Sequence, residues 1–253
     1  MEEPDLRLVQ DKVALVTGAA AGLGAAQARL LAAEGANVIL TDVAADLGAS
    51  TAASISNALF LPQDVREPAD WDRVLADIKT RFGRLDILVN NAGVVRFASI
   101  EDCSLDDFRL HMSVMAEGTF LGCQRAIPLM KECGGGSIVN IASIMSVRGG
   151  AQVLAYCAAK GAISAMTRSM AVHCLDQGNG VRVNAVLPGY HKTAMTEASL
   201  ARFPEDVRLE AKARFGSPDE VANLVVFLAS DASATINGAE IPIEGGRSLK
   251  YQG

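Results

Sequence analysis

The stretch KVALVTGAAAGLG, residues 12–24, decides the fold. It begins with apolar, β-branched residues typical of a buried strand, and it runs through a turn of small residues into the helical pattern LGAAQARLLAAEG. In such a turn Gly18 permits the sharp bend, Gly22 lets the backbone approach a ligand, and Gly24 lets helix and strand pack closely. The N–H groups at the start of the helix can hold a pyrophosphate. The stretch therefore predicts a strand–turn–helix unit that binds a dinucleotide, or a tight turn that binds nothing.

Further strand-like runs follow the first one, and most alternate with helical patterns. Repeated alternation of nearly continuous apolar runs with helices predicts an α/β fold. We expect a doubly wound parallel sheet with right-handed crossovers and helices on both faces. No linker or repeat divides the chain, so we expect one domain over residues 1–253, with an N-terminal tail of about residues 1–10. The further runs are NVILTD (37–42), ALFLPQD (58–64), LDILVNNAG (85–93), GSIVNIAS (136–143), VRVNAVLPG (181–189) and AEIPIEGG (239–246).

Charge and composition exclude several classes of partner. The 253 residues carry a net charge of −6, which argues against nucleic acid or an anionic membrane as the main partner. The N-terminus MEEPDLR lacks the features of a signal peptide, and the longest uncharged run, 133–147, is too short to span a bilayer, so we expect a cytoplasmic protein. Five cysteines without CxxC spacing predict ordinary buried thiols, and three histidines without ligand spacing predict no metal site.

Two acidic residues follow the second and third strand-like runs. Asp42 ends NVILTD, where a carboxylate can accept hydrogen bonds from an adenosine ribose. Asp64 ends ALFLPQD, where a carboxylate can face the adenine amino group. Because the carboxyl ends of parallel strands meet at one edge, these residues and the glycine turn converge on the crevice where such sheets bind ligands. The sequence therefore predicts a dinucleotide site.

The stretch SIMSVRGGAQVLAYCAAKGA, residues 143–162, carries three polar side chains in apolar surroundings. Tyr156 and Lys160 are four residues apart, which places them on one face of a helix, and Ser143 ends a predicted strand. A buried lysine is costly unless it is compensated. The residues alone fit either a catalytic group or a surface helix whose lysine extends to water while the tyrosine packs.

Four motifs in order add a resemblance to a known family. The GxxxGxG spacing of the first turn, NNAG (90–93), YCAAK (156–160) and PG (188–189) resemble the compact single-domain branch of the short-chain dehydrogenase/reductase family. The resemblance covers residues 10–246, and its C-terminal part, 214–246, has Glu244 where Asp is commoner. It implies a Rossmann-type fold and an NAD(H)-dependent oxidoreductase that interconverts a secondary alcohol and a ketone.

The resemblance also implies the roles of individual residues. Tyr156 matches the catalytic acid/base, Lys160 would bind the nicotinamide ribose and lower the pKa of the tyrosine, and Ser143 would hydrogen-bond the substrate oxygen. Asp42 would repel a 2′-phosphate, and neither Ala21 nor Val43 supplies a cation to attract one, so NAD is expected rather than NADP. The expected cofactor contacts are Gly18, Gly22, Leu23, Gly24, Asp42, Asp64, Val65, Asn91, Ala92, Gly93, Tyr156, Lys160, Pro188, Gly189 and Thr193.

One position departs from the family pattern. Met115 stands where the family has an Asn that is counted with the catalytic residues, and Met can neither donate nor accept strongly. His111, one helical turn earlier, is the nearest polar residue that could substitute. Met115 is either native, with another group shaping the proton relay, or an engineered change. The departure leaves open a catalytically weakened nucleotide-binding regulatory or scaffold protein, and the fold also leaves open dehydration or epimerisation through a ketone.

The expected surroundings of the nicotinamide are apolar and predict a bulky hydrophobic small-molecule substrate, such as a hydroxysteroid. Residues 190–215 have the length of a closing lid, and Arg96 and Arg148 could instead receive a carboxylate. Residues 105–131 and 153–177 predict helices with more apolar surface than one sheet face needs, which suits a homotetramer or homodimer, or an internal core only. The expected pocket residues are Val94, Val95, Met145, Val147, Val153, Leu154, Tyr190 and Met195.

Overall fold

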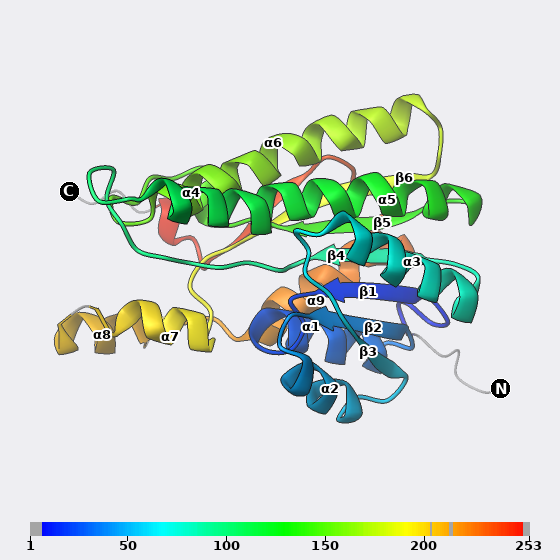
Figure 1. The fold of residues 1–253 in the computed structure, drawn as a ribbon, viewed down its shortest axis with the longest axis horizontal. Helices are drawn as coiled ribbons and strands as arrows, with labels where there is room; N and C mark the ends of the chain where they lie inside the picture. The colour runs from blue at the N-terminus through cyan, green and yellow to red at the C-terminus, as the bar shows by residue number, and fades with distance from the viewer. Residues whose placement is uncertain (1–6, 203, 213–214, 250–253) are drawn as a thin grey trace.

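The computed structural model describes residues 7–202, 204–212 and 215–249 (Figure 1). Its centre is a seven-stranded parallel sheet with the order β3-β2-β1-β4-β5-β6-β7. This confirms the predicted doubly wound α/β fold. The strands are β1 (Val13–Thr17), β2 (Asn37–Asp42), β3 (Ala58–Pro62), β4 (Ile87–Asn90), β5 (Gly136–Ile141), β6 (Val181–Pro188) and β7 (Glu240–Ile243).

Helices cover both faces of the sheet, as Figure 1 shows. One face is covered by α1 (Gly22–Ala33), α2 (Ala45–Ala53) and α9 (Pro218–Ala229). The other is covered by α3 (Pro68–Phe82), α5 (Gly118–Glu132) and α6 (Leu154–Asp176). Three shorter helices, α4 (Leu105–His111), α7 (Ala194–Leu200) and α8 (Glu205–Lys212), lie beyond the carboxyl ends of the strands.

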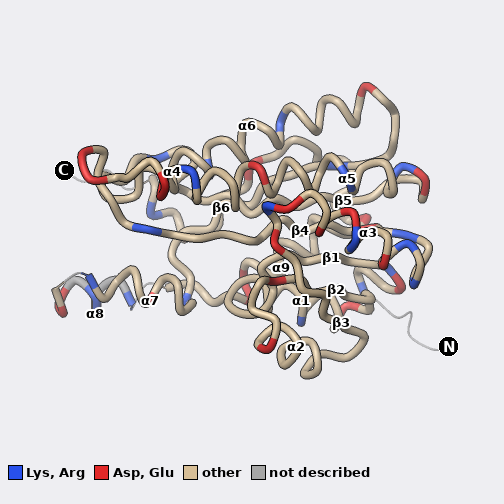
Figure 2. The backbone as a smooth tube through the Cα atoms, viewed as in Figure 1, with Lys and Arg blue, Asp and Glu red and all other residues tan. Residues whose placement is uncertain are grey.

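The strands are apolar because both of their faces are buried. In β1 all five residues are buried, and Ala14 and Val16 pack toward α1 and α9 while Val13 and Leu15 pack toward α3. The central strands β1, β4 and β5 carry no charged residue, and Figure 2 shows charges of both signs spread over the helices and loops instead. Polar residues stand at the carboxyl ends of β1, β2 and β4, which are Thr17, Asp42 and Asn90, at the edge where the site lies.

The two long predicted helices differ in regularity. The second corresponds to α6, whereas residues 105–131 divide into α4, a π-helix at Met112–Glu117, and α5. Of the predicted N-terminal tail, residues 1–6 lie outside the described part, and Val9 is fully buried with its N–H donating to the carbonyl of Glu34 at 3.3 Å. No helix within the described residues is long and apolar enough to cross a membrane.

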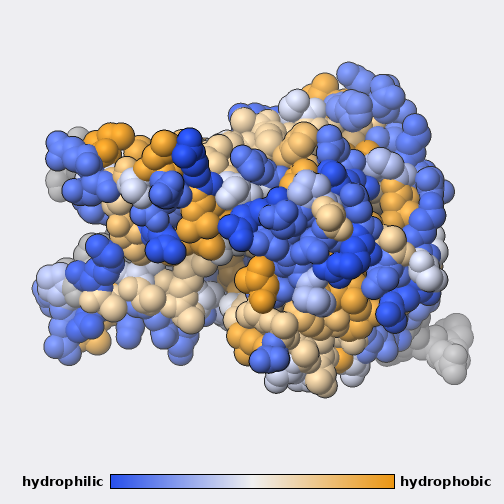
Figure 3. Space-filling view, viewed as in Figure 1, coloured by the Kyte–Doolittle hydropathy of each residue, from blue (hydrophilic) through white to orange (hydrophobic). Residues whose placement is uncertain are grey.

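The predicted lid, residues 190–215, is not one irregular segment, because it contains α7 and α8; residues 203 and 213–214 lie outside the described part. The two helices form an arm that projects from the body of the molecule (Figure 1). At its base the N–H of Gly216 donates to the carbonyl of Tyr190 (3.0 Å), and the ring of Tyr190 stacks on Phe215. Figure 3 shows the surface hollowed between this arm and the part of the molecule that carries α4.

Candidate active site

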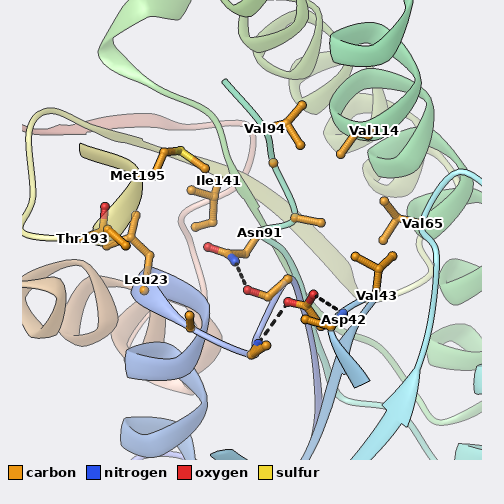
Figure 4. Close-up of a pocket in the computed structure, with 18 of the residues that line it drawn as sticks. Leu23, Asp42, Val43, Val65, Asn91, Val94, Val114, Ile141, Thr193 and Met195 are labelled. Atoms are coloured by element: carbon orange, nitrogen blue, oxygen red, sulfur yellow. Dashed lines mark hydrogen bonds between the residues drawn. The ribbon is translucent and has the colours of Figure 1, made fainter. Parts of the chain in front are cut away.

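A cavity of about 550 Å³ lies at the carboxyl ends of the strands (Figure 4). It brings together nearly all the residues that the sequence predicts for the site. Gly24 and Met115 are predicted site residues that do not line it. Those that do are Gly18, Gly22, Leu23, Asp42, Asp64, Val65, Asn91, Ala92, Gly93, Ser143, Tyr156, Lys160, Pro188, Gly189 and Thr193.

The glycine turn is held tightly against the residues that follow the carboxyl end of β4. Gly18 has φ +62°, and a Cβ there would lie 2.7 Å from the Cα of Ala92. A Cβ on Gly24 would lie 2.4 Å from the carbonyl oxygen of Gly18, so close packing of helix and turn requires glycine there. Helix α1 begins after Ala21, which has no side chain to cap the helix. Its first N–H groups are therefore suited to hold an anion such as a pyrophosphate.

Asp42 and Asn91 are fixed at the cavity by backbone hydrogen bonds (Figure 4). The two carboxylate oxygens of Asp42 accept from the N–H groups of Ala20 (3.1 Å) and Ala44 (3.0 Å). Each oxygen retains a lone pair that a ribose hydroxyl can use. The amide of Asn91 donates to the carbonyls of Thr17 (2.9 Å) and Gly18 (3.0 Å). The residues present therefore fit the ribose and pyrophosphate of a dinucleotide.

Asp64 lines the cavity, but its carboxylate is already engaged. Both oxygens accept from the guanidinium of Arg66, with the closest contact at 2.5 Å. The hydrogen bond with Arg66 lowers the pKa of Asp64 below its usual value. The sequence interpretation missed Arg66, although its position two residues after Asp64 signals the pair. The predicted contact of Asp64 with adenine therefore has to share the carboxylate with this guanidinium.

Ser143, Tyr156 and Lys160 meet at one wall of the cavity. Ser143 follows β5, and its hydroxyl accepts from the N–H of Met145 at 3.1 Å. Tyr156 and Lys160 lie one turn apart on α6, with the lysine Nζ 5.7 Å from the centre of the tyrosine ring. Lys160 is buried and donates to the carbonyl of Ile141 at 2.6 Å. The alternative of a surface lysine that extends to water is therefore wrong.

Burial shifts the pKa values of Tyr156 and Lys160 in this wall. It raises the pKa of the Tyr156 phenol above its usual value, and a hydrogen bond with Ser143 offsets only part of the rise. Burial also lowers the pKa of Lys160 to about 7. The ligand-free protein therefore keeps the tyrosine protonated and holds the lysine near the midpoint of its titration at neutral pH. The predicted lowering of the tyrosine pKa concerns the protein with bound oxidised cofactor and stays a prediction.

Met115 lies beneath the cavity. It is fully buried among Ala142, Ala159 and Ile163, and a Cβ on Gly93 would lie 3.5 Å from its sulfur. The helix nevertheless remains irregular here, because Met115 belongs to the π-helix. A methionine side chain is therefore compatible with the irregular backbone.

His111 does not reach toward Lys160. Its Nδ1 lies 2.7 Å from the carbonyl of Asp107, and its Nε2 accepts from the N–H of Arg96 at 3.0 Å. This pattern assigns the tautomer that carries its proton on Nδ1. The histidine holds the loop after β4 against α4, so it is not available as a substitute for the family Asn.

The substrate end of the cavity is apolar, but its residues differ from those predicted. Val94 and Met195 line it, as Figure 4 shows, whereas Val95, Met145, Val147, Val153, Leu154 and Tyr190 do not. Leu110 and Val114, which the sequence interpretation missed, replace them. Their spacing of four residues is typical of one helix face and could have revealed them.

Neither arginine considered as a carboxylate receptor lines the cavity. The Nε of Arg96 lies 3.4 Å from a carboxylate oxygen of Asp107, and Arg148 is exposed. Of the five cysteines, Cys123 and Cys174 are buried, and the other three are partly exposed. The described part of the chain contains no group of three or more His, Cys, Asp or Glu side chains placed to hold a metal ion.

Comparison with known proteins identifies the family. A family model described as enoyl-(acyl carrier protein) reductase matches residues 18–248. The chain is 40% identical over 240 residues to a 3-beta-hydroxysteroid dehydrogenase of Comamonas testosteroni, covering 92% of this chain and 94% of that protein. It is also 40% identical over 251 residues to a trans-4-hydroxycyclohexanecarboxylate dehydrogenase of Sinomonas cyclohexanicum, covering 95% and 94%. The crystal structure of levodione reductase superposes with a TM-score of 0.90 at 33% identity, covering 96% of this chain and 99% of that one.

Three observations indicate the same family: the wall formed by Ser143, Tyr156 and Lys160, the glycine turn, and these similarities. The chain belongs to the short-chain dehydrogenase/reductase family and is a short-chain alcohol dehydrogenase. Membership implies a nicotinamide dinucleotide, NAD or NADP, as the cofactor.

Proposed function

We propose that this protein oxidises a bulky hydrophobic secondary alcohol, such as a hydroxysteroid, to the ketone with NAD, and catalyses the reverse reduction. The observation that carries the proposal is the convergence of Ser143, Tyr156 and Lys160 on a cavity whose facing residues, Leu110 and Val114, are apolar. The bound dinucleotide supplies the hydride acceptor.

The side chains of this wall have separate roles in the transfer of the substrate proton. In the oxidative direction the Tyr156 oxygen removes the proton from the substrate hydroxyl, and the Ser143 hydroxyl holds the same substrate oxygen by a hydrogen bond. A phenol with a raised pKa is a poor base, so the positive charge of Lys160 is needed to favour the phenolate. In the reductive direction Tyr156 returns a proton to the substrate oxygen.

The preference for NAD rests on Asp42. Its carboxylate is fixed by Ala20 and Ala44 at the place where the adenosine ribose binds. A 2′-phosphate at the same place would meet a negative charge. The nearest cation on the cavity wall, Arg66, is paired with Asp64. This arrangement supports NAD over NADP.

The substrate class rests on the apolar walls and on the relatives. The relatives are named for action on a hydroxysteroid and on a hydroxycyclohexanecarboxylate. Leu110, Val114 and Met195 favour a similar alicyclic or steroid framework here. The carboxylate of the second relative's substrate is not expected here, because Arg96 and Arg148 do not line the cavity.

Exposed apolar residues support self-association. Phe120 on α5 and Val172 and Leu175 on α6 are 43%, 57% and 71% exposed. A homotetramer or homodimer that covers these helices is therefore proposed together with the function. Cytoplasmic location and the absence of nucleic-acid and membrane partners remain predictions from charge and sequence.

A substrate panel tests the proposed function. Purified protein with NAD is given hydroxysteroids, substituted cyclohexanols, polyols and hydroxy acids, and NADH formation is followed by absorbance. The proposal expects the highest kcat/KM with the steroid or alicyclic alcohols. Activity confined to polyols or hydroxy acids, or conversion without net NADH formation, would contradict it.

A further inference from the structure

Gln63 is a buried amide without a hydrogen-bond partner in the described part of the chain. Its residue is 3% exposed, and neither its side-chain oxygen nor its side-chain nitrogen has a partner. It lines the same cavity as Asp42 and Val65. A buried polar group left unpaired carries the full cost of its desolvation. A ligand group that pairs with this amide therefore gains more than it would at an exposed amide.

The position of Gln63 in the sheet relates it to the dinucleotide. Its N–H donates to the carbonyl of Asp42 at 3.0 Å, one step beyond the last paired residues of β2 and β3, Asp42 and Pro62. In this fold class the pyrophosphate lies at the turn after β1, and the acidic residue after β2 binds the ribose. Because β3 lies on the far side of β2 from β1, a base attached to that ribose would lie on the side of the sheet edge where Gln63 is found.

The chemistry of Gln63 complements adenine. Adenine presents an amino donor next to a ring-nitrogen acceptor, and a carboxamide pairs with both at once. Asp64, the residue first expected to face the amino group, has only acceptors, and Arg66 holds both of its oxygens. Unlike Asp64, Gln63 has an N–H group that can donate to a ring nitrogen of adenine.

We propose that the Gln63 side chain turns from its buried position when a dinucleotide binds, so that both amide atoms pair with the adenine base and make the cavity selective for adenine over a purine that carries oxygen in place of the amino group. The proposal rests on the dinucleotide of the proposed function. It adds a specificity-determining residue that lies outside the catalytic wall.

Binding measurements on Gln63→Met test the proposal, and Gln27→Met is the matched control. Gln27 on α1 is also fully buried with both amide atoms unpartnered, but it does not line the cavity. Calorimetric titrations with NAD and with its hypoxanthine analogue give dissociation constants without any turnover. The melting temperature of each ligand-free variant reports folding. If Gln63→Met does not fold, Gln63→Leu replaces it in the same titrations. Leucine is chosen because β3 already carries leucines at Leu59 and Leu61.

The proposal expects the wild type to bind NAD about tenfold more tightly than the hypoxanthine analogue, a difference of about 1.4 kcal/mol. Gln63→Met should lose about tenfold in NAD affinity and bind the two dinucleotides almost equally, while Gln27→Met keeps the wild-type constants. Both variants should melt at or above the wild-type temperature, because each loses an unpaired buried amide.

Two results would overturn the proposal: wild-type NAD affinity in Gln63→Met, or an equal loss for both dinucleotides. The first is also expected if an internal water satisfies the amide. A protein that discriminates the bases through Gln63 but turns over no alcohol supports this inference and contradicts the proposed reaction. A wild type that binds neither dinucleotide overturns both.

Discussion

The ammonium group of Lys160 donates a 2.6 Å hydrogen bond to the backbone carbonyl of Ile141, the last residue of β5. This bond ties the catalytic helix α6 to the strand that leads to Ser143. It also places a titratable group in the protein interior, where burial lowers the pKa of Lys160 to about 7.

The pKa of Lys160 predicts how the stability of the ligand-free protein depends on pH. An unfolded lysine titrates near 10.5, so between about pH 7 and 10.5 the unfolded chain binds one proton more at this position. This group therefore makes stability rise with pH across that window, by about 1.4 kcal/mol per unit, and contributes no slope below it. Lys160→Met should remove the rise.

Urea unfolding at pH 6, 8 and 9 checks the lysine prediction. Lys160→Met should exceed the wild type in unfolding free energy most at pH 6, and the difference should shrink as the pH rises. Lys131→Met, at an exposed lysine on α5, should follow the wild-type profile. A difference between Lys160→Met and wild type that does not change with pH would show that this lysine keeps its proton in the folded state.

Asp42→Asn should weaken the discrimination against NADP. The substitution removes the charge that repels a 2′-phosphate and keeps the size and one carbonyl acceptor, although one of the two backbone hydrogen bonds from Ala20 and Ala44 is lost with it. The ratio of kcat/KM with NAD to that with NADP should fall at least tenfold, mainly through a gain with NADP. Asp46→Asn, at an exposed position in the first turn of α2, is the control and should leave the ratio unchanged. An unaltered ratio in Asp42→Asn would mean that another group selects the cofactor.

Met115→Asn should increase turnover and barely change the affinity for NAD. The asparagine restores a polar side chain beside Ala159, the neighbour of Lys160 on α6, whereas the adenosine and pyrophosphate contacts lie elsewhere. Because Met115 is fully buried in an apolar cluster, the variant should also lose about 1–3 kcal/mol of stability. Steady-state kinetics, a cofactor titration and urea unfolding measure the three effects. Unchanged or lower turnover would show that this position does not limit proton transfer.

The sequence predicted those parts of the fold and site that rest on local patterns. Continuous apolar runs predicted the parallel strands, and the glycine spacing predicted the sharp turn at Gly18 and the close packing at Gly24. The positions of Tyr156 and Lys160 followed from helix periodicity, because residues four apart share a helix face. Each of these features depends on residues that lie close together in the sequence.

The other features of the site depended on side-chain rotamers and on contacts between distant segments. The pairing of Asp64 with Arg66 and the role of His111 in holding Arg96 are decided by side-chain rotamers and by loop packing. The arm formed by α7 and α8 was predicted only as a lid segment, since its helices are only seven and eight residues long. The raised pKa of Tyr156 follows from burial, which only the assembled cavity reveals.

The central claim is that Tyr156 carries the proton in an NAD-dependent alcohol oxidation, and one comparison tests it most directly. Turnover of the best hydrophobic alcohol and the dissociation constant for NAD are measured for wild type, Tyr156→Phe and the control Tyr190→Phe, whose residue does not line the cavity. Tyr156→Phe loses only a hydroxyl, so it should bind NAD within a few-fold of wild type while its turnover falls to near background; Tyr190→Phe should retain turnover. Substantial turnover in Tyr156→Phe would contradict the account, because the proton would then travel by another route.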